Sequence, residues 1–163
     1  MSNYGFKQAI EKFNCDLIET PVGDKYVAEA MKKYDAALGV EQSGHIIISD
    51  LLPVGDGLVT LIYVLKAMQH FGVALSDFKR EHLYEYPQKL TNLELKNKLN
   101  DEELEYINQI ALDMSIKKDL DGRYLIRNSG TEPLLRVLVE AKSNEAMEDF
   151  SNELITKINK YLN

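Results

Sequence analysis

The sequence is poor in cysteine, in positive charge and in long apolar runs, which are features typical of several classes of protein. Cysteine occurs once in 163 residues, as Cys15, so no disulfide can form within the chain. Acidic residues outnumber basic ones and give a net charge of −7 at pH 7, which argues against a nucleic-acid-binding face and against binding to anionic lipid. The longest apolar run, residues 58–65, falls far short of the roughly 20 residues of a membrane-spanning helix. The N-terminus lacks the pattern of a signal peptide, so we expect a cytoplasmic protein without nucleic-acid or membrane partners.

Hydrophobic periodicity in the first part of the chain predicts an α/β arrangement. We predict helices at 5–14 and 24–34, a strand at 15–21, and two strands at 36–42 and 45–52 that form a hairpin. Cys15, at the start of the first strand, is expected to be a small buried apolar residue. A helix at 57–71, capped by Asp56, is apolar on almost every side and is therefore expected to be buried.

The second part of the chain predicts a compact α+β domain. Strands are predicted at 89–95, 123–127 and 134–141, and helices at 101–114 and from a Ser143 cap to 162, with both helices on one face of the sheet. Alternation along the last strand should bury Leu135 and Val137 and turn Arg136 the other way. Charged and aromatic residues between the two parts predict a linker. The expected organisation is therefore residues 1–72, a linker at 73–88, and a second domain at 89–163.

Arginine is scarce, yet three of the four arginines fall between residues 123 and 136. Arg127 begins the segment Arg-Asn-Ser-Gly-Thr-Glu-Pro at 127–133, and Arg136 follows it. Guanidinium groups match phosphate in a bidentate manner, hydroxyl groups add donors, and glycine lets the backbone approach a ligand closely. We hypothesise a phosphate site, the alternative being a polar hairpin loop with two surface arginines. Its candidate residues are Arg127, Ser129, Gly130, Thr131 and Arg136.

A second polar segment, Gly-Val-Glu-Gln-Ser-Gly-His at 39–45, lies between two predicted strands. The carboxylate of Glu41 accepts hydrogen bonds, while the hydroxyl of Ser43 and the imidazole of His45 donate or accept them. Such a loop can bind several hydroxyl groups of a sugar. The alternative is a polar turn in which Gly44 supplies a positive φ.

The two motifs, in this order and at this separation, resemble the C-terminal part of bacterial phosphoglucosamine mutases, which belong to the α-D-phosphohexomutase superfamily. Shorter matches at 1–6, 20–27 and 55–58 extend the resemblance over essentially the whole chain. It implies a partial third domain of the phosphohexomutase fold, which reads the sugar, followed by a TATA-binding-protein-like fourth domain, which holds the phosphate. The residues expected at the sugar are Glu41, Ser43, His45, Asp24 and Lys25.

Enzymes of this family interconvert glucosamine 6-phosphate and glucosamine 1-phosphate through a phosphoserine in the first domain and magnesium held by aspartates of the second. Neither the serine loop nor the aspartate loop occurs in this sequence. The resemblance therefore implies a glucosamine phosphate ligand, the missing N-terminal domains as partners, no magnesium bound by this chain, and no mutase activity from the chain alone. Two alternatives stay open: a non-catalytic module that binds sugar phosphates or other partners, and a neighbouring hexose phosphate as substrate.

Two residues depart from the family pattern. Val40 stands where a glycine is usual, and a valine there would alter the sugar loop if that glycine adopts a positive φ. Asn128 stands where a proline is usual, and the loss of the proline ring is expected to loosen the phosphate loop while keeping its donors.

Overall fold

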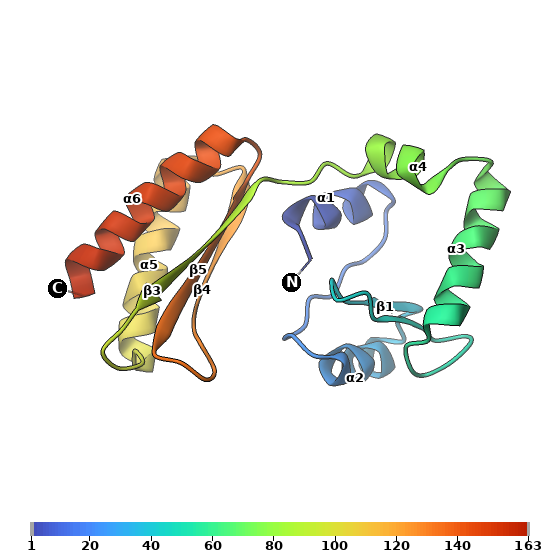
Figure 1. The fold of residues 1–163 in the computed structure, drawn as a ribbon, viewed down its shortest axis with the longest axis horizontal. Helices are drawn as coiled ribbons and strands as arrows, with labels where there is room; N and C mark the ends of the chain where they lie inside the picture. The colour runs from blue at the N-terminus through green and yellow to red at the C-terminus, as the bar shows by residue number, and fades with distance from the viewer. Residues whose placement is uncertain (1, 163) are drawn as a thin grey trace. The chain divides into compact units, whose positions relative to one another are not determined.

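Figure 1 shows the computed structural model of the chain, which describes residues 2–162. The chain divides into two compact units, Met1–Tyr84 (unit 1) and Glu85–Asn163 (unit 2), and each is described by itself. The segment 73–88, where the sequence predicts a linker, contains a helix, α4 (Leu75–His82).

Unit 1 contains a two-stranded antiparallel hairpin and four helices in its described part. The hairpin confirms the predicted pairing, with Val40 opposite Ile46, although each strand is only three residues long. The predicted helices are also confirmed. The elements are α1 (Tyr4–Lys12), α2 (Asp24–Tyr34), β1 (Leu38–Val40), β2 (Ile46–Ile48), α3 (Gly57–Phe71) and α4.

The hairpin packs closely on α2 because Gly39 has no side chain. Gly39 is buried, and a Cβ at this position would overlap the Sδ atom of Met31 and the Cγ1 atom of Val27. Met31 and Ile47 are buried as well, at 8 % and 4 % exposure. This close packing fixes the hairpin, and the polar loop between its strands, against α2.

The predicted strand at 15–21 is wrong. Asn14 takes a left-handed φ of 53° just after α1, and the residues that follow are irregular and mostly exposed. Cys15 is exposed rather than buried. A short apolar stretch does not form a strand without a neighbouring strand to pair its backbone groups, and the described part of unit 1 offers none beside it.

Helix α3 has the predicted bounds and cap but not the predicted burial. The Oδ1 atom of Asp56 accepts a hydrogen bond from the Val59 N–H at 2.9 Å. Leu58 is 74 % exposed, and Leu61 and Leu65 are each 53 % exposed. The helix packs against β2, and a three-residue strand is too small to cover more than one side of a 15-residue helix.

No helix in the described part of the chain is long and apolar enough to cross a membrane by itself. Helices α3 and α4 reach the necessary length and composition only when joined, and they are bent by 76° relative to each other.

Unit 2 is a three-stranded antiparallel sheet with two helices on one face (Figure 1), as the sequence predicts. The strand order β3-β5-β4 places β5 in the centre. A capping box between Asn100 and Glu103 starts α5, and the Ser143 hydroxyl caps α6 by accepting from the Ala146 N–H at 3.1 Å. The elements are β3 (Gln88–Glu94), α5 (Asp101–Lys117), β4 (Gly122–Asn128), β5 (Leu134–Ala141) and α6 (Asn144–Leu162).

The core of unit 2 lies between the sheet and its two helices. The predicted inner face of β5 is confirmed, because all four of its residues have no exposed surface, and the cluster around them includes buried side chains of α5 and α6. Since side chains alternate along a strand, Arg136 lies on the opposite face. The hydrophobic pattern of β5 therefore determines which face of the sheet carries this arginine. The four inner-face residues are Leu135, Val137, Val139 and Ala141.

Candidate functional site

The sheet of unit 2 places two arginines side by side. Arg127 of β4 and Arg136 of β5 are direct partners in the antiparallel ladder, and Asn92 of β3 is the partner of Arg136 on its other side. Partner side chains share a face of the sheet, with Cα atoms about 4.5–5.5 Å apart. Like charges placed directly opposite repel each other, and an anion between them would remove that repulsion.

The loop between these strands, residues 129–133 (the anion loop), has backbone donors free to bind a ligand. The Ser129 N–H donates to the Leu134 carbonyl at 2.7 Å and closes the loop. The N–H groups of Gly130, Thr131 and Glu132 are in an exposed stretch and have no acceptor among residues 2–162. A Cβ added to Gly130 would meet nothing within 4 Å, so there is open space beside the backbone at this point. Successive free N–H groups of this kind can bind an anion.

Two polar atoms at the same end of the sheet are buried without a partner in the described part of the chain. They are the Oγ atom of Ser129, whose residue is 2 % exposed, and the Nε atom of Arg136. An unsatisfied buried donor costs about 1–3 kcal/mol, and buried polar groups in native proteins generally have a partner. Phosphate oxygens are acceptors suited to both groups.

Residues 95–99, which precede α5, are tied to the anion loop and the end of β4 by three sets of contacts. The Asn128 Nδ2 atom donates to the Leu99 carbonyl at 2.8 Å, and its Oδ1 atom accepts from the Leu99 N–H at 3.3 Å. The Leu95 N–H donates to the Pro133 carbonyl at 2.9 Å, and the Lys98 Nζ atom donates to the Gly130 carbonyl at 2.6 Å. Asn128 thus anchors the strand end through its side chain, which opposes the expectation of a loosened loop.

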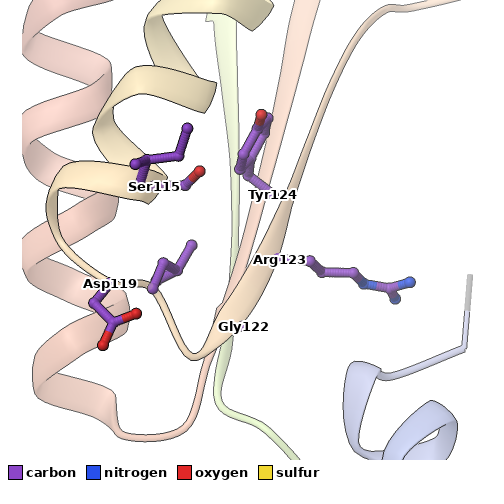
Figure 2. Close-up of a pocket in the computed structure, with 7 residues that line it drawn as sticks. Ser115, Asp119, Gly122, Arg123 and Tyr124 are labelled. Atoms are coloured by element: carbon purple, nitrogen blue, oxygen red, sulfur yellow. The ribbon is translucent and has the colours of Figure 1, made fainter.

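Arg123, the third arginine of the cluster, is engaged elsewhere. Its Nε atom donates to the Oε2 atom of Glu140, which is fully buried. A shallow pocket of about 280 Å³ lies at the start of β4, the end of the strand that is remote from the anion loop. It is lined by residues that include Ser115, Asp119 and Tyr124 (Figure 2). The guanidinium group of Arg123 extends away from the other labelled side chains that line the pocket (Figure 2).

In unit 1, the start of α2 and the loop after β1 are joined by Glu41. Its Oε1 atom accepts from the Gly23 N–H at 3.1 Å, directly before Asp24, the first residue of α2. The Glu41 N–H donates to the His45 carbonyl at 2.9 Å. Gly44 has a φ of 90°, so the turn does use a positive φ there. Asp24, at the first position of α2, thus lies next to the glycine that Glu41 contacts, and Glu41 and His45 lie on the loop between the two strands.

Ser43 and Lys25, the remaining predicted sugar residues, are exposed. Ser43 lies in the turn, and the Lys25 Nζ atom is 3.8 Å from Glu29, with its side chain 74 % exposed. The imidazole of His45 packs against Gly55, where a Cβ would overlap the ring. Val40 does not adopt a positive φ and pairs in the hairpin, so valine fits this position without backbone strain.

Magnesium, which the resemblance implies for the full-length enzyme, does not fit the residues present. Among residues 2–162 no three His, Cys, Asp or Glu side chains are grouped so that they could hold a metal ion.

The anion loop together with Arg127 and Arg136 is called the anion site below. The sequence did not indicate two further residues that lie beside it. Asn92 joins it only through the register of β3 with β5, and Lys98 only through the path of the chain before α5. Neither residue lies in a motif, so no local sequence signal pointed to them.

Two family models match the chain in sequence. The model described as phosphoglucomutase/phosphomannomutase, alpha/beta/alpha domain III, matches residues 1–86, and the phosphoglucomutase/phosphomannomutase C-terminal domain matches residues 90–157. The phosphoglucosamine mutase of Bacillus subtilis is 40 % identical over 155 residues, and that of Streptococcus agalactiae is 45 % identical over 150 residues. These alignments cover 95 % and 91 % of this chain but only 34 % and 33 % of the relatives, so the chain spans about a third of their length.

Solved structures show the same fold. An Aspergillus fumigatus N-acetylphosphoglucosamine mutase matches 99 % of this chain and 37 % of its own with a TM-score of 0.82 at 19 % identity. Another structure of that enzyme, in complex with GlcNAc-6P and magnesium, matches 99 % of this chain and 38 % of its own with a TM-score of 0.76 at 19 % identity. The sequence matches cover both units, and the architecture agrees with them: the chain belongs to the phosphoglucomutase/phosphomannomutase family and comprises its third-domain and C-terminal-domain regions.

Proposed function

We propose that the chain is the substrate-binding C-terminal part of a phosphoglucosamine mutase, an isomerase that interconverts glucosamine 6-phosphate and glucosamine 1-phosphate by phosphotransfer. The observation that carries the proposal is the end of the β4–β5 hairpin, where Arg127 and Arg136 stand opposite each other beside free backbone donors. The names of the relatives at 40–45 % identity supply the substrate.

The anion site is suited to the phosphate group of the substrate. The guanidinium groups of Arg127 and Arg136 supply two positive charges on one face of the sheet. The Ser129 hydroxyl and the N–H groups of Gly130 and Thr131 supply neutral donors from the loop. Charge-assisted hydrogen bonds are roughly twice as strong as neutral ones, so the arginines should dominate affinity and the loop should define orientation.

The sugar is assigned to unit 1. We propose that Glu41, Asp24, Lys25, Ser43 and His45 contact its hydroxyl and amino groups. Glu41 already accepts one hydrogen bond from Gly23, but a carboxylate has about four lone-pair sites and can accept others. A carboxylate also suits a protonated amino group, which favours an amino sugar over a neutral hexose.

The chain does not supply the whole reaction. Phosphoryl transfer in this family needs a donor nucleophile and a metal ion in addition to a phosphate clamp. We therefore propose that catalysis requires the N-terminal part present in the relatives and that the 163 residues alone bind substrate without converting it. An assay with glucosamine 6-phosphate, magnesium and a trace of the bisphosphate should yield no glucosamine 1-phosphate. Turnover that is lost in Arg127→Ala would contradict this.

Titration calorimetry tests the binding function. A hydrogen bond to a charged group contributes about 1.5–3 kcal/mol, so Arg127→Ala should weaken binding of glucosamine 6-phosphate by about tenfold or more. Arg80→Ala is the matched control, because Arg80 lies on α4 in an ion pair with Asp77, 2.8 Å away. Equal affinities of wild type and Arg127→Ala, or equal losses in the two variants, would reject the proposal.

A further inference from the structure

We propose that Lys98 is a positioning residue of the anion site, which holds the Gly130–Thr131 peptide so that the Thr131 N–H is presented to the bound anion. The proposal deepens the proposed function and rests on it. Lys98 lies 32 residues from Gly130 in sequence and is outside every motif.

One hydrogen bond joins Lys98 to the anion loop. The Lys98 Nζ atom donates to the Gly130 carbonyl at 2.6 Å. This carbonyl belongs to the same peptide group as the Thr131 N–H. In a planar trans peptide the C=O and N–H bonds point in opposite directions. A lysine that holds the carbonyl on one side therefore turns the Thr131 N–H to the other side.

That other side is free to take a ligand. The Thr131 N–H has no acceptor within residues 2–162, and a Cβ on Gly130 would meet no atom within 4 Å. Without the lysine bond, this peptide can rotate about its flanking bonds and turn the N–H away, because a glycine restrains its own backbone very little. The lysine thus supplies a restraint that Gly130 lacks.

The backbone of Lys98 is fixed from both sides. The Leu95 N–H donates to the Pro133 carbonyl at 2.9 Å, and Asn128 holds Leu99 with contacts of 2.8 and 3.3 Å. A long exposed side chain normally loses rotamer freedom when it bonds to a distant partner. Here the chain segment is already held beside the loop, so only the side chain itself must be ordered. This distinguishes Lys98 from an ordinary surface lysine.

Lys98 also carries a positive charge, which would attract an anion even without orienting a peptide. The two effects are separable because a neighbouring lysine offers the same charge without the contact. Lys96 is exposed and has no hydrogen bond or ion pair with any other residue from 2 to 162. Lys96→Met therefore removes one charge from the same segment and leaves the Gly130 carbonyl held.

The test is titration of the full chain with inorganic phosphate, comparing wild type, Lys98→Met, Lys96→Met and Lys98→Arg. We expect Lys98→Met to bind phosphate about fivefold more weakly than Lys96→Met, which corresponds to one lost hydrogen bond of ordinary strength. The difference should persist in added salt, since screening weakens the charge effect of an exposed group. Lys98→Arg, which can still donate to the carbonyl, should recover most of the affinity.

A spectroscopic readout tests the contact without any ligand. In phosphate-free protein, Lys98→Met should move the carbonyl ¹³C resonance of Gly130 and the amide resonance of Thr131, and Lys96→Met should move neither. Equal phosphate affinities and unchanged resonances in the two variants, with wild type binding and Arg127→Ala weakened, would overturn the role of Lys98 alone. Failure of wild type to bind phosphate would overturn both this inference and the proposed function.

Discussion

Replacing Ser129 with alanine should stabilise the ligand-free protein and lower its affinity for phosphate. The Ser129 hydroxyl is buried, with the residue 2 % exposed, and its Oγ atom has no partner in the part of the chain that the structure describes. Removing a buried unsatisfied polar group recovers about 1 kcal/mol or more. For a unit of this size that corresponds to a rise in Tm of about 4–8 °C per kcal/mol.

Phosphate should stabilise wild type more than it stabilises Ser129→Ala. When the anion accepts from the hydroxyl, wild type gains stability that Ser129→Ala cannot gain, so the rise in Tm with phosphate concentration should be smaller for the variant. Thermal unfolding followed by circular dichroism, with and without phosphate, measures both effects. Ser129→Ala that destabilises the free protein by about 1 kcal/mol, within the range of a lost satisfied hydrogen bond, would refute the reasoning.

Ser151 provides the matched control. It lies on α6, is 1 % exposed, and its Oγ atom is likewise buried without a partner within residues 2–162. Ser151→Ala should also stabilise the free protein, helped by the higher helix propensity of alanine. Because it is remote from the anion loop in sequence and lies on the helical layer, its response to phosphate should equal that of wild type. A phosphate response reduced in Ser151→Ala would show a general effect of stability rather than the loss of a ligand contact.

Three further results follow from the packing and charges. Gly122→Ala should destabilise unit 2 by about 1–3 kcal/mol in urea unfolding, because the added Cβ would overlap the Glu140 carbonyl in the neighbouring strand. An unchanged urea midpoint would contradict the β4–β5 register. The hydrogen bond from Lys142 lowers the pKa of Asp121, so this contact stabilises the fold above about pH 4 and is lost as the pH falls through the lowered pKa. Asp121→Asn should therefore reduce the loss of unfolding free energy at acid pH, by less than about 1 kcal/mol because the pair is exposed. If the variant and wild type lose the same unfolding free energy at acid pH, the stabilising role of the Asp121–Lys142 contact is refuted. Leu61→Gln on the exposed face of α3 should reduce binding of a hydrophobic dye without lowering the Tm, and a large loss of Tm would show that this face is packed.

The sheet of unit 2 can be predicted from the sequence because apolar and polar residues alternate clearly within single strands. Alternation along residues 134–141 identifies the inner face, and that alone determines the side of Arg136. The pairing of Arg127 with Arg136 follows once the two strands form a short hairpin. The five predicted phosphate residues are accordingly on one hairpin, whereas their contact with phosphate stays a prediction.

Other features depend on contacts between distant segments, which one sequence does not reveal. The apolar composition of α3 predicts burial, but burial requires a partner surface, and β2 covers only one side. The stretch after Asn14 has strand-forming residues but no strand beside it within residues 2–84. Lys98 and Asn92 reach the anion site through chain path and register. The sugar site, the division at 72 and 88, and the cytoplasmic location also stay predictions.

The most direct test of the central claim is an amide NMR titration of the full chain with glucosamine 6-phosphate. If the anion loop holds the phosphate, the resonances of Gly130, Thr131 and Glu132 should shift in a saturable manner, and glucosamine without the phosphate should leave them unmoved. Absence of shifts in the loop at saturating ligand, or the same shifts with glucosamine alone, would contradict the claim that this hairpin binds the phosphate of the substrate.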